Sequence, residues 1–287
     1  MNEATRPEPT AEARKAMRKR ERELAGLDPV MARIIESAGP CTMHARLETT
    51  PFESLASSIA HQQLNGAVAQ RILQRFVALY APAPFPEPAA LRATDETQLR
   101  AVGFSFAKIR ALHDLADKTM AGVVPASHEL VELEDDHIIE RLTQVRGIGP
   151  WTVHMMLMFQ LGRPNVLPID DYGVRNGFRL AYGLKGLPTP RALREFGERW
   201  QPHCSIAAWY LWRAVDLARA GKLPKPSRPP RVAIQKQRVA AKPKRAAKPK
   251  RSAKPVRSTK SKRSAKPKRS AKPRHSTKPR RRAARKP

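Results

Sequence analysis

Apolar residues recur every three or four positions along most of the first 220 residues, a spacing that places them on one face of an α-helix. In one such segment, Phe52, Leu55 and Ile59 share a face directly after Thr50-Pro51. Threonine followed by proline is typical of a helix start, because threonine caps the first turn and proline lacks an N–H that would be unpaired there. No segment of useful length alternates apolar and polar residues as a half-buried strand does. The pattern predicts an all-α body.

The predicted helices begin at Asp28-Pro29, which repeats the same start signal. The first 25 residues are charged on all sides, and we interpret them as a frayed helix or a leader. Turn signals such as Asn65-Gly66 separate the later segments. By residue number, the predicted helices start at 29 and then cover 51–64, 68–79, 94–102, the segment between 103 and 122, 135–145, 151–161, 168–183, 190–200 and 203–220.

The net charge of +30 is concentrated at one end of the chain. Residues 224–287 hold 27 of the 55 Lys and Arg and no Asp or Glu, so residues 1–223 hold 28 basic against 25 acidic residues. Within the tail, Lys recurs every six residues from Lys242 and is usually followed by Pro, which blocks a continuous helix. We expect a charged leader or helix at 1–27, a folded domain at 28–223 and a disordered basic repeat tail at 224–287.

The two cysteines, Cys41 and Cys204, are too few for a disulfide framework, a four-thiolate zinc site or an iron–sulfur cluster. The N-terminus lacks the apolar core of a signal peptide. The longest apolar run, 153–162, is about half as long as a membrane span requires. We therefore expect an intracellular protein with no bound metal or iron–sulfur cluster and no membrane partner.

The stretch Arg146-Gly-Ile-Gly-Pro150 connects two predicted helices. Gly147 and Gly149 allow a backbone with positive φ and leave room for a ligand to approach. The amide groups of such a turn and of the next helix N-terminus point outward together, which makes an anion site. An ordinary helical hairpin also uses glycine to end its first helix, and the Gly-x-Gly spacing taken alone favours that simpler interpretation.

Four motifs in a fixed order favour the anion-binding interpretation of this turn over the ordinary helical hairpin. They are Ser58-Ile-Ala-His-Gln-Gln-Leu-Asn65, Leu142-Thr-Gln-Val-Arg-Gly-Ile-Gly-Pro-Trp-Thr152, Leu167-Pro-Ile-Asp-Asp-Tyr-Gly-Val-Arg175 and Pro202-His-Cys-Ser-Ile-Ala-Ala-Trp-Tyr-Leu-Trp-Arg213. Together they resemble the helix-hairpin-helix, Gly/Pro-rich, Asp-bearing superfamily of DNA glycosylases, and within it the DNA-3-methyladenine glycosylase II family. The resemblance implies a two-lobed, all-α glycosylase fold from about residue 28 to 220. The tail resembles linker-histone tails in composition only.

This resemblance implies that Asp171 is the essential carboxylate. Cleavage of an N-glycosidic bond develops positive charge on the deoxyribose, and a nearby carboxylate stabilises that charge. From the residues alone, Asp170-Asp171 also fits an N-cap pair that starts the following helix. The two interpretations are compatible if Asp170 caps the helix and Asp171 faces the substrate.

Superfamily members that also cut the DNA strand carry Lys where this chain has Trp151. No Lys lies between Lys118 and Lys185, so the resemblance implies a monofunctional enzyme that uses water and leaves an abasic site. N-alkylated purines such as 3-methyladenine and 7-methylguanine are cationic and favour electron-rich ring faces. We expect Trp212, Trp151 and Tyr172 around the base, and assign Trp200 and Trp209 to the core.

A damaged nucleotide must leave the base stack before excision, and a protein side chain fills the vacated space. Gln62, Gln63 and Leu64 match the segment with that role, although the glutamines also fit helix-terminal hydrogen bonding. With Gly147 and Gly149, these residues are the predicted contacts to double-stranded DNA that contains alkylated bases. The hairpin is also a candidate site for a monovalent cation, and we expect no other cofactor.

Two alternative functions stay open at this point. One is a non-enzymatic helix-hairpin-helix protein that binds or shapes DNA, and the other is a glycosylase for a different lesion. The basic tail favours retention on DNA, with targeting as the alternative. For the enzyme, we expect a monomer in the bacterial cytoplasm, associated with the nucleoid.

Overall fold

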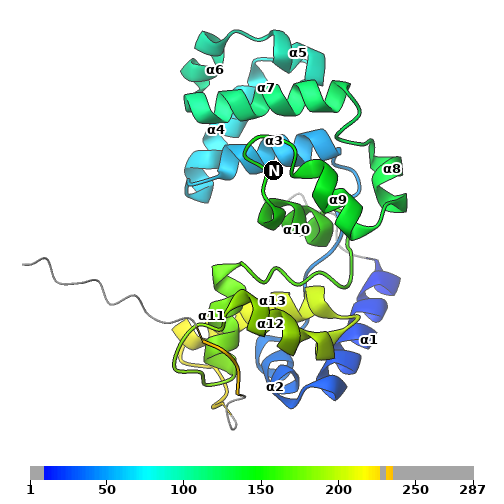
Figure 1. Ribbon diagram of the computed structural model, residues 1–287, viewed down its shortest axis with the longest axis vertical. Coiled ribbons are helices and arrows are strands. Elements are labelled where there is room, and N and C mark those ends of the chain that lie inside the picture. The colour runs from blue at the N-terminus through cyan, green and yellow to red at the C-terminus, as the bar shows by residue number, and fades with distance from the viewer. Residues whose placement is uncertain (1–9, 227–230, 235–287) are drawn as a thin grey trace, which may run out of the picture. The chain divides into compact units, whose positions relative to one another are not determined.

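The computed structural model describes residues 10–226 and 231–234. Their regular structure is helical apart from one isolated bridge, so the all-α prediction is confirmed. None of the described helices is long and apolar enough to cross a membrane. The elements in Figure 1 are α1 (Ala11–Leu27), α2 (Pro29–Ala38), α3 (Pro51–His61), α4 (Gly66–Ala78), α5 (Pro88–Ala93), α6 (Glu96–Val102), α7 (Phe106–Met120), α8 (Ser127–Glu132), α9 (Asp135–Leu142), α10 (Pro150–Phe159), α11 (Tyr172–Ala181), α12 (Pro190–Gly197), η2 (Glu198–Trp200) and α13 (Cys204–Arg219).

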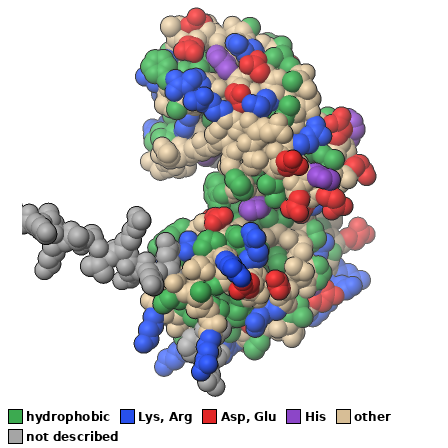
Figure 2. Space-filling view, in the orientation of Figure 1, with side chains coloured by type: hydrophobic (Ala, Val, Ile, Leu, Met, Phe, Trp, Pro, Cys, Tyr) green, Lys and Arg blue, Asp and Glu red, His purple; other side chains and the backbone are tan. Residues whose placement is uncertain are grey.

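The folded body extends further along the chain than the predicted end at residue 223. The backbone N–H of Thr189 donates to Ala233 O at 2.8 Å, Pro188 and Ile234 form the isolated bridge, and Val232 packs against the core. The predicted disorder of the repeat falls on residues 235–287, outside the described residues. Figure 2 shows charged side chains of both signs interspersed over one face of the body, as its nearly balanced charge requires.

Helices α3 to α7 pack around a group of aromatic side chains. Phe76 of α4 is fully buried, and the rings of Tyr80, Phe85 and Phe104 meet it edge-on with centroids 5.4 to 5.8 Å away. Aromatic pairs prefer this T-shaped arrangement, which adds to the free energy gained from burial. Phe52 of α3 extends the cluster by meeting Phe85 edge-on, with centroids 6.1 Å apart, and α3 packs against α7.

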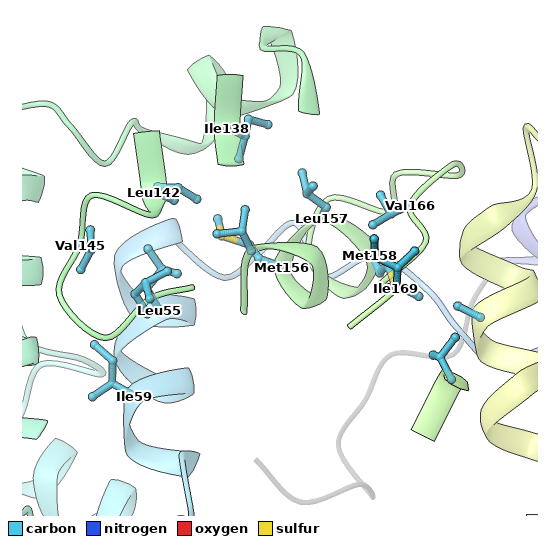
Figure 3. Close-up of a cluster of buried hydrophobic side chains, with 14 of the residues drawn as sticks. Leu55, Ile59, Ile138, Leu142, Val145, Met156, Leu157, Met158, Val166 and Ile169 are labelled. Carbon is cyan, nitrogen blue, oxygen red and sulfur yellow. The ribbon is translucent and has the colours of Figure 1, made fainter. Parts of the chain in front are cut away.

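Helix α10, which follows the Gly-x-Gly turn, is enclosed by apolar side chains from several elements (Figure 3). Its residues Met156, Leu157 and Met158 are buried. A helix that is apolar on all sides lies inside a protein rather than along its surface. Trp151, one residue into α10, is by contrast 47% exposed. The surrounding cluster comes from α3, α9 and two loops: Leu55, Ile59, Ile138, Leu142, Val145, Val166 and Ile169.

The buried Asp28 connects the start of α2 to two residues far along the chain, Tyr182 just after α11 and Trp200 at the end of η2. Asp28 is 2% exposed and caps α2, with Oδ1 accepting the N–H of Val30 at 2.9 Å. Its Oδ2 accepts the Tyr182 hydroxyl at 2.6 Å and the Trp200 indole N–H at 3.0 Å. Burial, with the adjacent carboxylate, raises the pKa of Tyr182 above its ordinary value, so this hydroxyl remains a donor.

We interpreted residues 1–25 as a frayed helix or a leader. Their described part is a helix, α1, but it belongs to the folded body. Glu21 of α1 is 7% exposed, and its Oε1 accepts the N–H of Cys41 and the hydroxyl of Tyr210, both at 2.6 Å. Burial raises the pKa of the Cys41 thiol to about 12. The apolar pattern did not reveal the two buried positions of α1, Glu21 and Leu24, because most residues of this helix are charged.

We predict that Asp28→Ala lowers the free energy of unfolding by about 3 kcal/mol, because the change removes a helix cap and leaves two buried donors unsatisfied. Urea unfolding at pH 7 measures the change. Asp136→Ala, which removes an exposed carboxylate from α9, is the control and should alter stability by less than about 0.5 kcal/mol. Equal losses in the two variants would contradict the role assigned to Asp28.

Candidate active site

Asp171 lies at the N-terminus of α11 and caps it. Its Oδ1 accepts the backbone N–H of Val174 at 2.7 Å, which satisfies one donor of the first helical turn. Asp170 is exposed and does not cap the helix, so our division of roles between the two aspartates is wrong. One side chain is both the helix cap and the candidate catalytic carboxylate. The partial positive charge of the helix N-terminus favours its negative charge.

The carboxylate of Asp171 also accepts two indole N–H groups. Trp212 Nε1 donates to Oδ1 at 2.8 Å, and Trp151 Nε1 donates to Oδ2 at 2.8 Å. These tryptophans belong to α13 and α10, so three elements meet at one side chain. A carboxylate offers about four acceptor positions, and the backbone and the two indoles occupy three of them. One acceptor position therefore stays open, and it is on Oδ2.

Two glycines of α11 allow this close approach. A Cβ at Gly173 would lie 2.7 Å from Trp212 Cδ1 and 3.1 Å from Asp171 Oδ1. A Cβ at Gly177 would collide with the carbonyl oxygen of Leu211, a backbone atom of α13. Sequence reasoning missed both glycines, although their spacing of four residues places them on one face of the helix.

The aromatic side chains predicted for the base pocket lie in different environments. Trp212 is half-buried, and its ring stacks on Phe159, with centroids 5.9 Å apart and planes inclined by 25°. Trp151 is 47% exposed and Tyr172 is 68% exposed, so both present surface to a ligand. Trp200 is fully buried beside Asp28, away from this group. Sequence reasoning missed Phe159, which supports Trp212.

The Gly-x-Gly turn connects α9 to α10. Gly147 has φ +79°, a conformation that side chains other than glycine rarely adopt. Gly149 has φ −106°, so our expectation of positive φ at both glycines is wrong for the second one. A Cβ at Gly149 would meet no atom within 4 Å, so this side of the turn is open. The backbone N–H groups of Gly147, Gly149 and Trp151 have no acceptor among the described residues.

The part of the chain that the structure describes has no cluster of three or more His, Cys, Asp or Glu that could hold a metal ion, and Cys41 and Cys204 are free thiols. The candidate cation site at the hairpin would not need such a cluster, since a monovalent cation can be bound by backbone carbonyl oxygens. Four of its carbonyl oxygens accept no hydrogen bond from described residues, which fits such a cation: those of Thr143, Gln144, Arg146 and Ile148.

Helix α3 ends at His61, three residues before the predicted end, and the next three residues form a loop beside the hairpin. Gln62 Nε2 donates to Gly147 O at 2.8 Å, so this side chain ties the loop to the turn. Gln63 has φ +57°, and Leu64 is 40% exposed. Of the three predicted DNA contacts in this loop, Gln63 and Leu64 are exposed, while Gln62 supports Gly147.

Asp114 of α7 anchors the hairpin from the other side. Its Oδ2 accepts the backbone N–H of Arg146 at 2.6 Å, and Lys118 Nζ lies 2.8 Å from Oδ1. Partial burial raises the pKa of this carboxyl, but the Arg146 N–H and Lys118 outweigh burial and hold the pKa below its ordinary value. Sequence reasoning missed Asp114, because its partner is 32 residues away along the chain.

Residues 56–202 match the HhH-GPD superfamily of base excision DNA repair proteins, and this range includes the hairpin and Asp171. The chain belongs to that superfamily. The HhH-GPD chain is 37% identical over 214 residues to DNA-3-methyladenine glycosylase 1 of Schizosaccharomyces pombe, an alignment that covers 74% of this chain and 94% of the relative.

Two solved structures resemble this HhH-GPD chain over most of their length. The 3-methyladenine DNA glycosylase of S. pombe in complex with abasic DNA is 38% identical, with a TM-score of 0.63, and the match covers 70% of this chain and 98% of that one. A DNA-3-methyladenine glycosidase from Bacillus halodurans is 31% identical, also with a TM-score of 0.63, covering 70% and 91%. The predicted glycosylase fold is thereby confirmed.

We predict that Asp114→Ala lowers the free energy of unfolding by about 2 kcal/mol at pH 7, since it leaves Arg146 N–H unpaired. A carboxyl whose pKa is lower in the folded state stabilises above its unfolded pKa near 4, and this contribution is lost as the pH falls through the folded value. Urea unfolding at pH 7 and near pH 3 should show the gap between wild type and variant narrowing in acid. Asp117→Ala, on the same helix, is the control. A difference in stability between wild type and Asp114→Ala that does not depend on pH would contradict the role assigned to Asp114.

Proposed function

We propose that this HhH-GPD protein is a monofunctional DNA glycosylase that flips out alkylated purines of the 3-methyladenine and 7-methylguanine type and releases them by hydrolysis. The carboxylate of Asp171, held by two indoles next to the amides of the hairpin, is the observation that carries this proposal. Relatives named as 3-methyladenine glycosylases support the substrate class. The finer likeness to the glycosylase II family is part of the proposal.

In this proposal the backbone amides of the hairpin bind DNA, and the side chains around Asp171 act on the nucleotide. The outward N–H groups of Gly147, Gly149 and Trp151 suit a DNA phosphate. The carboxylate of Asp171 stabilises the positive charge that develops on the deoxyribose and orients water through its open acceptor position on Oδ2. The rings of Trp212 and Tyr172 attract a cationic base, and because such a base already leaves readily, no general acid is required.

The chain offers no local amine for strand cleavage. The position where lyases of this superfamily carry Lys is Trp151, and no Lys lies between Lys118 and Lys185. The ammonium group of Lys108 donates to Ala60 O at 2.8 Å, near the end of α3. Water is therefore the proposed nucleophile, and the product is an intact strand with an abasic site.

The remaining parts of the proposal concern partners and location. Double-stranded DNA is the partner, the enzyme acts as a monomer, and it requires no cofactor beyond a monovalent cation at the hairpin. We place it in the bacterial cytoplasm on the nucleoid. Because the body carries only 28 basic against 25 acidic residues up to residue 223, the tail supplies most of the attraction to phosphates.

We predict that wild type releases 3-methyladenine and 7-methylguanine from methylated duplex DNA, and that Asp171→Asn lowers the single-turnover rate by about 100-fold or more. Base release is measured by chromatography of the freed purines. Asp170→Asn changes the exposed neighbour and should keep the wild-type rate within about threefold. Tight DNA binding without release by any variant would favour the architectural alternative, and release of other bases only would favour a different lesion.

We predict that removal of residues 235–287 flattens the dependence of DNA affinity on salt, because each phosphate neutralised by Lys or Arg adds about 0.9 to the slope of log K against log salt. The single-turnover rate at saturating enzyme should not change. A full-length variant with every Lys and Arg of residues 235–287 replaced by Gln controls for chain length and should match the truncation. An unchanged slope would contradict a role of the tail in DNA retention.

A further inference from the structure

Trp151 belongs to two sites at once. Its backbone N–H is one of the three hairpin amides that have no acceptor among the described residues. Its indole Nε1–H donates to Asp171 Oδ2 at 2.8 Å. A single residue thus connects the proposed phosphate site to the proposed catalytic carboxylate.

The two indole donors on Asp171 are not equivalent. Trp212 is half-buried, stacks on Phe159 and fits beside Gly173, which has no Cβ to obstruct it. Its indole N–H and the backbone N–H of Val174 both donate to Oδ1. That side of the carboxylate is fixed by the fold. Trp151 is the sole donor to Oδ2 among the described residues and is 47% exposed. The direction of the open acceptor position on Oδ2 therefore depends on Trp151.

We propose that Trp151 is a positioning residue whose indole N–H aims the open acceptor position of Asp171 at the reacting sugar and water. Because its backbone N–H lies in the hairpin, binding of a DNA phosphate there fixes the start of α10 and with it this indole. The proposal rests on the proposed glycosylase function and gives Trp151 a role other than stacking on the base.

The hydrogen bond and the ring can be separated by substitution. Trp151→Phe keeps an aromatic ring and the backbone N–H but removes the indole donor. A hydrogen bond to a charged group corresponds to about 10- to 100-fold in rate when it acts on the transition state. We expect Trp151→Phe to lose about that much in single-turnover release of 7-methylguanine, while affinity for abasic-site DNA stays within about twofold.

A second readout does not depend on activity. In a nitrogen–proton NMR spectrum of the full-length protein, the indole signal of Trp151 is assigned by its absence from Trp151→Phe. We expect this signal to move in Asp171→Asn and on addition of undamaged duplex DNA, because both changes act on its partners. Trp209→Phe is the matched control, since Trp209 lies on α13 against Tyr210 and Arg213 and donates no hydrogen bond to Asp171.

Each outcome decides between distinct roles. A Trp151→Phe rate within threefold of wild type would overturn the proposal in favour of stacking alone. Rate and DNA affinity falling together would overturn it in favour of a merely structural role at the hairpin. If wild type releases no alkylated base, the proposed function fails, and the indole signal in Asp171→Asn still decides whether Trp151 holds the carboxylate.

Discussion

The approach of α11 to the backbone of α13 at Gly177 is the constraint on which the site depends. Only a residue without a Cβ allows the Leu211 carbonyl to lie against α11 at this point. One turn earlier on the same face, Gly173 makes room for the indole of Trp212 beside Asp171. The two glycines thus bring a helix cap and a distant tryptophan within hydrogen-bond distance.

The other half of the site depends on burial rather than on glycine. Most of helix α10 after its exposed first two residues is buried among apolar side chains, and this burial holds the helix in place. The turn before it is tied down from two directions, by Gln62 from the end of α3 and by Asp114 from α7. These two contacts hold the hairpin whose free amides form the proposed phosphate site, and they hold the start of α10, where the Trp151 indole meets Asp171.

Charge has separate roles in the two parts of the protein. In the body, buried carboxylates such as Asp28 and Glu21 join elements that are far apart in the sequence, and each is satisfied by two or more donors. Asp171 uses the same chemistry at a partly exposed position, where one acceptor site remains open. Residues 224–287 contain basic residues but no Asp or Glu, a composition that suits sequence-independent attraction to phosphates.

The sequence by itself determined the all-α class, most helix positions and the Gly-x-Gly turn, because periodicity and local motifs act over a few residues. It pointed to Asp171 through a family resemblance, and the catalytic role of this residue is a proposal. Only the tertiary structure decided that Asp171 rather than Asp170 caps α11, that Gln62 binds Gly147 O, and that Trp151 and Trp212 share one carboxylate. It also showed that the charged helix α1 is attached to the folded body through its two buried residues, Glu21 and Leu24. These features join residues tens of positions apart, and hydrogen bonds between distant side chains leave no periodic trace in a sequence.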